Sequence, residues 1–293
     1  MAGRWFKPGS EERPTVGDWV VLVEDRSAVE SLVKRRNLLR RKQADGLAAQ
    51  PIAANVDALF IVTACNNEFN PSRLERYLLV AEDANVQPVI VLTKMDTTDT
   101  PETFVDAAVA IANGAPVHAV DALNGAGIEA LKPWCGPGQT LVLLGSSGVG
   151  KSTLLNSLAG TERQKTGAAR NTDDKGRHTT SHRSLHALPD GTLIIDSPGI
   201  RELGLTEDQS DPAAAFVDIE DLALTCRFRD CRHENEPDCA VRTGITSGLI
   251  DPRRLANWRR IHGEKAAARL TALTTKPRDT PKRKGKLARR PTK

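Results

Sequence analysis

The sequence has few aromatic residues, no long apolar run and an odd number of cysteines. Phe, Trp and Tyr together make up 4% of 293 residues, so a core must come largely from Ala, Val, Leu and Ile. No stretch approaches the roughly 18 to 20 consecutive apolar residues that span a bilayer. The first residues, MAGRWFKPGSEERP, also lack the apolar segment of a secretory signal. We therefore expect a cytoplasmic protein that has no membrane partner.

The five cysteines stand at positions 65, 135, 226, 231 and 239, with the last three close together. An odd, clustered set suits a metal site in a reducing compartment better than a disulfide framework. Cys65 and Cys135 fall at the ends of apolar segments, and we interpret them as buried thiols.

The net charge of +4 combines a basic C-terminal end with an acidic remainder. From Arg253 to Lys293 there are 15 Lys or Arg and two acids, which gives +13 and leaves −9 elsewhere. A basic tail on an acidic body favours a polyanionic partner. The alternative is a solvated tail that contacts nothing. Residues 273–293 hold three prolines and little that is apolar, so we predict a disordered tail there.

Apolar segments typical of strands alternate with segments of helical periodicity between about residues 51 and 206. We expect strands at 56–64, 88–94, 116–120, 140–145, 185–189 and 192–196, and helices at 71–86, 103–114, 127–134 and 151–160. This alternation predicts an α/β fold with a doubly wound, mostly parallel sheet.

The flanking segments differ from this pattern. Residues 16–25 and 28–37 are typical of β segments, and a basic loop, LLRRKQADGLAAQ, is expected after them. The residues after 206 are expected to be helical, with one Cys/His-rich interruption. We therefore divide the chain into a small β module (1–45), an α/β domain (46–206), a helical domain (207–272) and the tail (273–293).

The segment Gly145–Ser152 reads GSSGVGKS, a full match to the phosphate-binding loop GxxxxGK[ST], with a predicted strand before it and a helix after it. In such a loop, backbone N–H groups surround the phosphates at a helix N-terminus. Lys151 is then expected to reach the β- and γ-phosphates, and Ser152 to ligate Mg²⁺. The expected phosphate contacts are Gly145, Ser146, Ser147, Gly148, Val149, Gly150, Lys151, Ser152 and Thr153.

The residues Thr93, Lys94, Met95 and Asp96 read TKMD at the end of a predicted strand and are similar to the guanine motif [NT]KxD. The carboxylate of Asp96 would accept hydrogen bonds from guanine N1–H and the N2 amino group. Adenine has no such pair of donors, so a carboxylate there selects guanine. The alkyl stem of Lys94 would lie along the base.

The segment Asp196–Gly199 reads DSPG and matches the DxxG motif, in which the Asp holds Mg²⁺ through water and the Gly N–H meets the γ-phosphate. Thr179 and Thr180 lie between this motif and the phosphate loop. One of the two is expected to ligate Mg²⁺ as a switch threonine; the residues do not say which.

The motifs occur in an unusual order. A conventional GTPase presents the phosphate loop, the switch threonine, DxxG and then the base motif. Here TKMD comes first, followed by GSSGVGKS, HTT and DSPG. This order predicts a circularly permuted GTPase domain with its motifs still at the carboxyl ends of the strands. The segment after DSPG then leads directly into the C-terminal domain, which would pass the nucleotide state to it.

Cys226, Cys231, His233 and Cys239 supply three thiolates and an imidazole within a short segment. Such a set suits tetrahedral Zn²⁺ in a closed structural site, since four protein ligands leave no open position. Reduced cysteines in a small helical domain are the alternative.

These motifs strongly resemble the ribosome small-subunit-dependent GTPase A family, the RsgA or YjeQ type of permuted GTPase. The likeness runs from about Val16 to Gly263 and includes VGDWV, KRRNLLR, FNPSRLERYLLVAE, PVIVLTKMD, GSSGVGKSTLLN, GRHTT, DSPGIRELGL and CRFRDCRHENEPDCAV. It implies an N-terminal OB-fold, a permuted GTPase domain and a C-terminal zinc domain. It also implies GTP hydrolysis stimulated by the small ribosomal subunit during late maturation of that subunit.

The sequence departs from the family pattern in three places. About 40 residues precede the GTPase domain, fewer than a five-stranded OB barrel usually needs. Thr93 replaces the commoner Asn, which removes an amide that can tie the base motif to the phosphate loop. Asp121 replaces the usual Ser beside the guanine; we expect Asp121 and Ala122 to line the base, with Asp121 crowding Asp96.

The residue after DSPG is Ile200, where many GTPases carry the glutamine that orients the attacking water. A hydrophobic side chain cannot hold that water, so intrinsic hydrolysis is expected to be slow. We expect His178, in GRHTT, to supply the positioning, with Lys151 at the phosphates; the family resemblance also points to His178. The alternative is that His178 packs in the switch loop.

Two other functions remain open at this stage. One is a passive RNA-binding or scaffold protein with a structural nucleotide, and the other is an ATPase. The main prediction is a ribosome-assembly GTPase. We expect Mg²⁺ with GTP or GDP at the nucleotide site and one structural Zn²⁺. The expected partners are the small ribosomal subunit and its rRNA, and the protein is expected to be a monomer. Arg253, Arg254, Arg259 and Arg260 are expected on a helix that contacts RNA phosphates.

Overall fold

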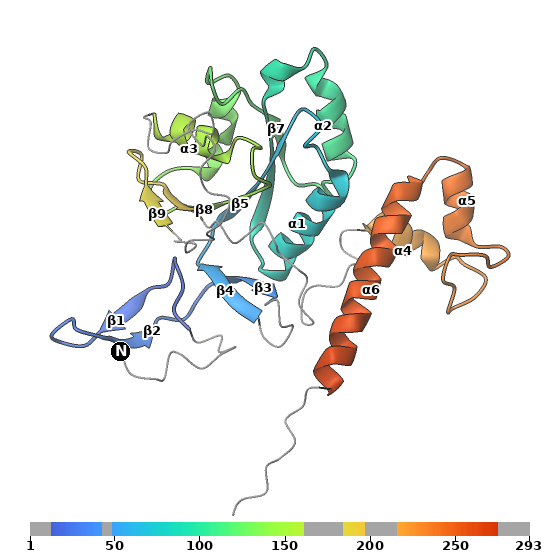
Figure 1. Ribbon diagram of the computed structural model, residues 1–293, viewed down its shortest axis with the longest axis horizontal. Coiled ribbons are helices and arrows are strands. Elements are labelled where there is room, and N and C mark those ends of the chain that lie inside the picture. The colour runs from blue at the N-terminus through green and yellow to red at the C-terminus, as the bar shows by residue number, and fades with distance from the viewer. Residues whose placement is uncertain (1–12, 43–48, 161–183, 197–215, 275–293) are drawn as a thin grey trace, which may run out of the picture.

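The computed structural model describes residues 13–42, 49–160, 184–196 and 216–274. A six-stranded sheet lies at its centre (Figure 1). The strand order is β7 (Val117–Ala119), β6 (Gln87–Thr93), β5 (Ala58–Ala64), β8 (Thr140–Leu144), β10 (Leu193–Asp196) and β9 (Ser184–Ala187). Neighbouring strands pair in parallel except β9, which pairs antiparallel with β10 at the edge. The mostly parallel sheet is as predicted.

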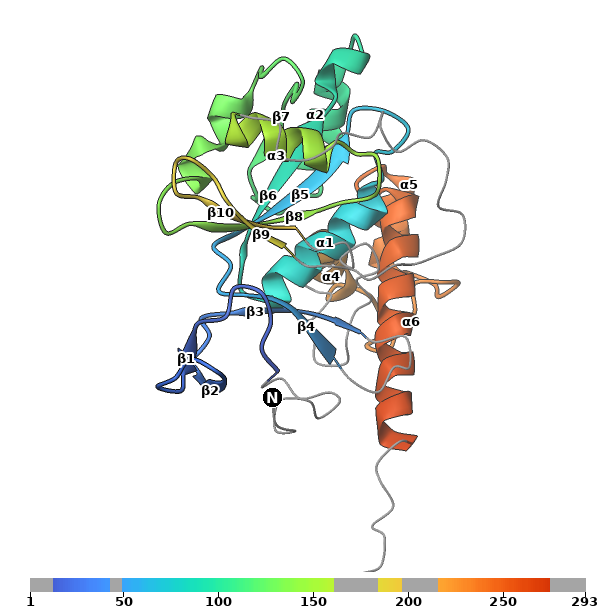
Figure 2. The same cartoon turned by 60° about the vertical axis from the view of Figure 1, so that its left-hand side comes forward.

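Side chains of the central strands are buried on both faces of the sheet, as their continuous apolar sequences indicate. All residues of β5 and β8 are buried. One face packs against α1 (Pro71–Asp83) and α2 (Pro101–Val109), and the other packs against α3 (Lys151–Ala159) and the 3₁₀ helix η2 (Ile128–Trp134). Figure 2 shows α1 and α3 on opposite sides of the sheet. The doubly wound arrangement is therefore confirmed.

The N-terminal segment forms two antiparallel ladders. β1 (Val20–Leu22) pairs with β2 (Val29–Leu32), and β3 (Leu38–Lys42) pairs with β4 (Ala49–Ala54). The prediction of a loop over 38–50 is wrong for these two strands, because Leu39 is buried in the α/β core although three basic residues directly follow it. The β3–β4 ladder crosses the division that we placed after residue 45, and the outline of an OB-like module stays a prediction.

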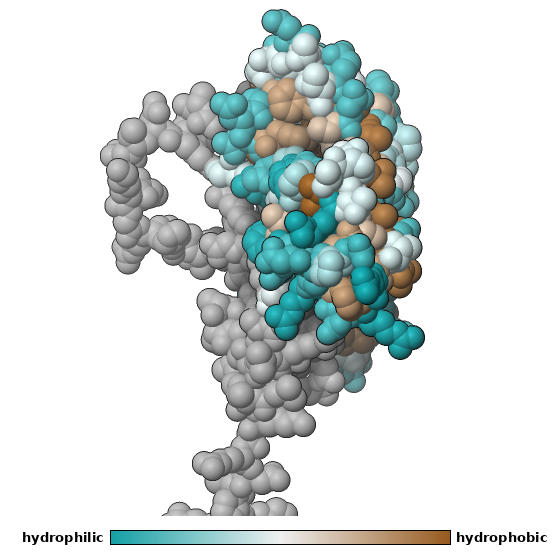
Figure 3. All heavy atoms as spheres, turned by 90° about the vertical axis from the view of Figure 1, so that its right-hand side faces the viewer, coloured by the Kyte–Doolittle hydropathy of each residue, from teal (hydrophilic) through white to brown (hydrophobic). Residues whose placement is uncertain are grey.

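The C-terminal part is helical, as predicted, in the residues described. The helices α4 (Val217–Ala223), α5 (Ala240–Thr246) and α6 (Pro252–Thr274) enclose a small apolar core that also includes Leu79 of α1. Figures 1 and 2 both show α6 beside α1. On this side of the molecule, hydrophilic residues are interspersed with separate apolar spots (Figure 3). Among the described helices, none has the length and apolar character needed to span a membrane.

Candidate functional site

The predicted nucleotide-binding residues follow the carboxyl ends of parallel strands. TKMD begins at the last residue of β6, Asp121 and Ala122 follow β7, and the phosphate loop follows β8. Asp196 is the last residue of β10. Because these strands run in parallel, their carboxyl ends meet at one edge of the sheet. The fold therefore brings the separate motifs of the sequence together at that edge.

The phosphate loop connects β8 to α3 and contains two positions whose space or backbone conformation requires glycine. A Cβ atom on Gly145 would lie 2.2 Å from the carbonyl oxygen of Val62, so only glycine fits. Gly150 has φ +95°, in the left-handed region, and precedes α3 without a side-chain cap. The N-terminus of α3 thus follows the loop without a capping side chain, which is the arrangement that binds phosphate. Lys151 Nζ donates to the carbonyl oxygen of Gly145 at 2.8 Å and also to that of Ser146.

Thr93 joins the base motif to the phosphate loop. Its buried hydroxyl lies 3.0 Å from the carbonyl oxygen of Thr63 and within hydrogen-bonding distance of that of Val149. Thr63 belongs to β5 and Val149 to the loop. The expectation that Thr93 loses the tie made by the usual amide is therefore wrong, because the shorter hydroxyl makes a contact of the same kind.

The rest of the base motif forms a short helical turn after β6. Lys94 has φ 56° and occupies the N-cap position of the short 3₁₀ helix η1 (Met95–Thr97), without a capping hydrogen bond from its side chain. Asp96 is exposed in this helix, beyond the end of β6. Burial, together with the nearby charge of Asp96, raises the pKa of Cys65 to about 11. Cys65 is therefore a buried, protonated thiol, as expected. Cys135 is half-buried.

The carboxylate of Asp121 is held by its own loop. One oxygen accepts hydrogen bonds from the backbone N–H groups of Leu123 at 2.9 Å and Asn124 at 3.1 Å, and the other accepts from the Asn124 side chain at 2.6 Å. The side-chain bond from Asn124 is the main cause of a lowered pKa at Asp121. These bonds favour a loop-stabilising carboxylate over one that crowds Asp96.

Arg73 is a residue that sequence analysis missed at this site. It lies in the first turn of α1, where its N–H is capped at 3.0 Å by the side chain of Asn70. Its guanidinium donates to the hydroxyl of Ser146 in the phosphate loop. Arg73 and Ser146 are 73 residues apart in the sequence, so no local sequence pattern predicts this contact.

Several predicted site residues fall outside the described part of the chain. These are His178, Thr179, Thr180 and Gly199, together with Ile200. Asp196 is described only as the end of β10. Their roles stay predictions.

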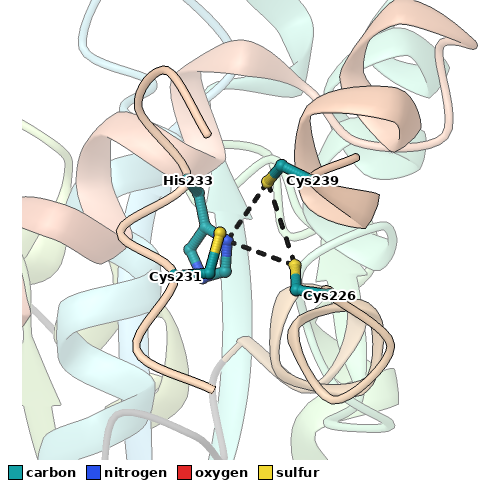
Figure 4. A group of neighbouring side chains, drawn as sticks. All are labelled: Cys226, Cys231, His233 and Cys239. Atoms are coloured by element: carbon teal, nitrogen blue, oxygen red, sulfur yellow. Dashed lines mark hydrogen bonds between the residues drawn. The ribbon is translucent and has the colours of Figure 1, made fainter. Parts of the chain in front are cut away.

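The Cys₃His cluster is brought together between α4 and α5 (Figure 4). The four candidate ligand atoms of Cys226, Cys231, His233 and Cys239 all lie within 4.8 Å of one another. The Cys226 and Cys239 sulfurs are 3.9 Å apart, and His233 Nδ1 lies 3.6 Å from the first and 3.4 Å from the second. A tetrahedral Zn²⁺ with ordinary bond lengths separates two sulfurs by about 3.8 Å and a sulfur from a nitrogen by about 3.6 Å. The cluster therefore fits this metal.

Neighbouring groups fix the cluster in place. His233 is buried with φ 60°, and its carbonyl oxygen accepts a hydrogen bond from Arg259 of α6. The ring of Trp258 meets the His233 ring edge-on, with centroids 5.5 Å apart. The Trp258 indole N–H donates to Glu220 of α4 at 2.7 Å. Such outer contacts orient metal ligands.

The arginines of α6 are not a uniform basic surface. Arg254 is buried and forms ion pairs at 2.6 Å with both Glu75 of α1 and Asp218 of α4. Arg259 bonds to His233, and Arg260 donates to Asn257. The expectation that this whole set faces RNA is wrong for Arg254, because its charge is neutralised inside the protein; Arg253 is exposed.

A permuted phosphate-loop nucleotide site and a Cys₃His module on one chain define a class of GTPase. A family model described as RsgA GTPase matches residues 32–206. A curated relative from Vibrio vulnificus (strain CMCP6), named small ribosomal subunit biogenesis GTPase RsgA 2, is 46% identical over 88% of this chain and 74% of its own length. The corresponding RsgA protein of Xanthomonas oryzae is also 46% identical, over 90% of this chain and 73% of its own. The chain therefore belongs to the RsgA GTPase family and is a GTP hydrolase.

Solved structures show the same architecture. YjeQ from Thermotoga maritima is 26% identical and matches with a TM-score of 0.61 over 86% of this chain and 84% of its own. YloQ, described as a circularly permuted GTPase, matches with a TM-score of 0.54 over 94% of this chain and 86% of its own. At 24% identity, the second likeness concerns the fold alone.

Proposed function

We propose that this protein binds the small ribosomal subunit and hydrolyses GTP there during late maturation of the subunit. Bound GTP sets the affinity for the subunit, and hydrolysis releases the protein. The observation that carries the proposal is the contact from Thr93 to Val149, which joins a guanine motif to a phosphate loop at one sheet edge. The names of relatives at 46% identity support the ribosomal part.

Guanine selection is assigned to Asp96, with Thr93, Lys94 and Met95 around it and Asp121 and Ala122 on the next loop. The exposed Asp96 carboxylate follows β6 directly, on the side where the phosphate loop also opens. An anionic acceptor pairs with guanine N1–H and N2–H, whereas adenine leaves the carboxylate without donors.

The phosphates are assigned to the backbone of Gly145–Thr153 and to Lys151, with the Gly199 N–H at the γ-phosphate. A GTPase of this family uses Mg²⁺ with GTP, and oxygen ligands suit that ion. Ser152 stands in the first turn of α3, and Asp196 ends the strand next to β8, so both lie at the edge where an Mg²⁺–phosphate group would sit. Thr179 or Thr180 completes this set. The ion would neutralise charge on the phosphates.

Hydrolysis is assigned to water positioned by His178, because Ile200 has no polar group to hold it. Because residue 200 cannot hold the water, intrinsic turnover is expected to be slow and to rise when the subunit is bound. Lys151 stabilises the charge that develops on the transferred phosphoryl group.

The Cys₃His cluster is assigned to one structural Zn²⁺ per chain. Three thiolates and one imidazole fill a tetrahedral shell, so the ion would hold the loop between α4 and α5 and take no part in hydrolysis. The β module over 1–45, the helical domain over 207–272 and the basic tail over 273–293 are assigned to rRNA contact, and the protein is expected to act as a monomer.

The decisive experiment measures GTP hydrolysis with and without purified small subunits, with ATP in parallel. Subunit-stimulated turnover of GTP, with ATP ineffective, is the expected result. A scaffold with a structural nucleotide would turn over GTP at the same rate in both conditions, and an ATPase would use ATP; either outcome would contradict the proposal.

A further inference from the structure

The helix α1 contacts two parts of the protein through residues only two positions apart. Arg73 reaches the phosphate loop, where it donates to the Ser146 hydroxyl. Glu75 faces the C-terminal helices, where it is paired with Arg254 at 2.6 Å. Residues at i and i+2 of a helix point in different directions. The first half of α1 therefore contacts the phosphate loop on one side and the C-terminal helices on another.

The contact with Ser146 sets the direction of that hydroxyl. A serine hydroxyl has one hydrogen to donate, and its oxygen here accepts from Arg73. The hydrogen is consequently directed away from the guanidinium. The carbonyl oxygen of the same serine accepts from Lys151 Nζ. Ser146 is thus held beside the amine assigned to the β- and γ-phosphates, with its hydroxyl oriented to donate and a half-buried positive charge behind it.

The contact with the C-terminal helices is buried and specific. The side chains of Glu75 and Arg254 are only 1% and 8% exposed. The second oxygen of Glu75 accepts from Asn257, which also donates to the carbonyl oxygen of Ser72 at 3.4 Å. Leu79, one turn further along α1, is buried in the C-terminal core. One face of α1 therefore carries Ser72, Glu75 and Leu79. This face packs against the helices α4, α5 and α6, which together with the Cys₃His cluster form the C-terminal module.

We propose that Arg73 is a positioning residue for the nucleotide phosphates, acting through Ser146, and that the C-terminal module holds its helix in place through Glu75. The inference rests on the nucleotide site proposed above. It adds a second connection between the Cys₃His module and that site, separate from the segment after DSPG. Because the positive charge stands near the amine of Lys151, it favours the more highly charged GTP over GDP.

The first test compares Arg73→Ala, Ser146→Ala and the double variant in the full-length protein. Affinities for GTP and GDP are measured separately with fluorescent nucleotides. We expect each single change to lower the ratio of GTP to GDP affinity by about fivefold, and the double change to lower it no further, since both remove one interaction. Arg73→Lys, which keeps a cationic donor, should restore the ratio to within about twofold. Arg76→Ala on the same helix is the matched control.

The second test asks whether the module holds α1. Glu75→Gln keeps the size of the side chain but removes the charge that faces Arg254. We expect it to lower the same ratio by about threefold in the wild-type background and to leave it unchanged in the Arg73→Ala background. Metal content and thermal unfolding, measured for every variant, report whether the module stays folded.

The outcomes separate this inference from the proposed function. If the unaltered protein does not prefer GTP over ATP, the nucleotide site itself is wrong. If it does, and Arg73→Ala keeps the ratio of GTP to GDP affinity, the positioning role is overturned. An equal loss for GTP and GDP would mark a structural role only and would overturn it too. An effect of Glu75→Gln that multiplies with that of Arg73→Ala would overturn the role of the module.

Discussion

The hydroxyl of Thr93 meets the carbonyl oxygen of Val149 across 56 residues of sequence. This contact fixes the end of β6 to the phosphate loop, so the base-binding and phosphate-binding segments keep a constant separation. A guanine nucleotide must bridge both segments at once. We therefore expect loss of the Thr93–Val149 hydrogen bond to lower the affinity for the nucleotide.

Thr93→Val should weaken the connection between β6 and the phosphate loop while leaving the volume of the core nearly unchanged. It removes the donor and leaves a buried carbonyl without that partner, which costs about 1 to 3 kcal/mol in the free energy of unfolding. We expect lower affinity for GTP and GDP alike. Chemical denaturation and nucleotide titration measure the two effects. Thr93→Ser, which keeps the hydroxyl, is the control, and equal losses in both variants would contradict the role given to the hydroxyl.

The sequence predicted the edge of the sheet where nucleotide binds, because that information is local. Strand β8 and the glycines after it form a continuous pattern that specifies a strand, a tight loop and a helix. The hydroxyl bridge of Thr93 was not predictable from the motif, since it depends on how β6 packs beside the loop. Leu38–Lys42 was misassigned because its charges dominate the pattern, although Leu39 is buried.

Asp96→Asn should exchange guanine preference for xanthine preference. The amide presents a donor where guanine also has a donor, whereas xanthine has an acceptor there. Competition binding with GTP, XTP and ATP tests the exchange. Asp99→Asn alters an exposed carboxylate three residues away and should leave the preference for GTP intact. If Asp96→Asn keeps that preference, Asp96 does not contact the base.

Substitution of His178 should affect the rate of GTP hydrolysis but not the affinity for GTP. His178→Ala should leave GTP affinity near normal and reduce subunit-stimulated hydrolysis by about 10² to 10³-fold, the range for loss of a positioning group. Lys151→Ala should instead lose phosphate affinity and turnover together. Steady-state hydrolysis with small subunits, beside nucleotide titration, measures both. His182→Ala is a control from the same stretch of sequence; stimulated turnover of His178→Ala within twofold of normal would refute the assignment.

The Cys₃His cluster should hold one Zn²⁺ per chain. Cys231→Ser or His233→Ala should lose the metal, since each removes one of the four ligands. The C-terminal module should then become sensitive to protease, while the α/β domain still binds nucleotide. Elemental analysis and limited proteolysis measure these results. Cys135→Ser changes a thiol outside the cluster and should keep its metal; full zinc content in Cys231→Ser would mean that the metal binds elsewhere.

The C-terminal arginines illustrate what charge alone does not reveal. The count of positive residues after Arg253 is correct, yet Arg254 is buried between Glu75 and Asp218, which are 179 and 36 residues distant in sequence. Pairing at such separations is decided by the packing of α6 on α1 and α4. A basic stretch therefore predicts a polyanion-binding surface only for side chains that the fold leaves outside.

The last prediction concerns the basic end of the chain beyond α6. Residues 275–293 contain nine Lys or Arg and one Asp. Each phosphate contact releases counterions, so the log of the affinity for the small subunit should fall steeply with the log of the salt concentration. Deleting residues 275–293 should weaken binding and reduce that slope by about one for each contact removed, with intrinsic GTP hydrolysis unchanged.

Two point variants extend this test to the helix α6. Arg253→Gln removes an exposed charge and should reduce the slope by no more than about one. Arg254→Gln should leave the slope unchanged, because that guanidinium is already neutralised by two carboxylates. It should instead lower the stability of the C-terminal module, since Glu75 would remain buried without its charged partner. Binding at several salt concentrations decides the matter: the same affinity and slope with and without residues 275–293 would mean that the tail contacts nothing on the subunit.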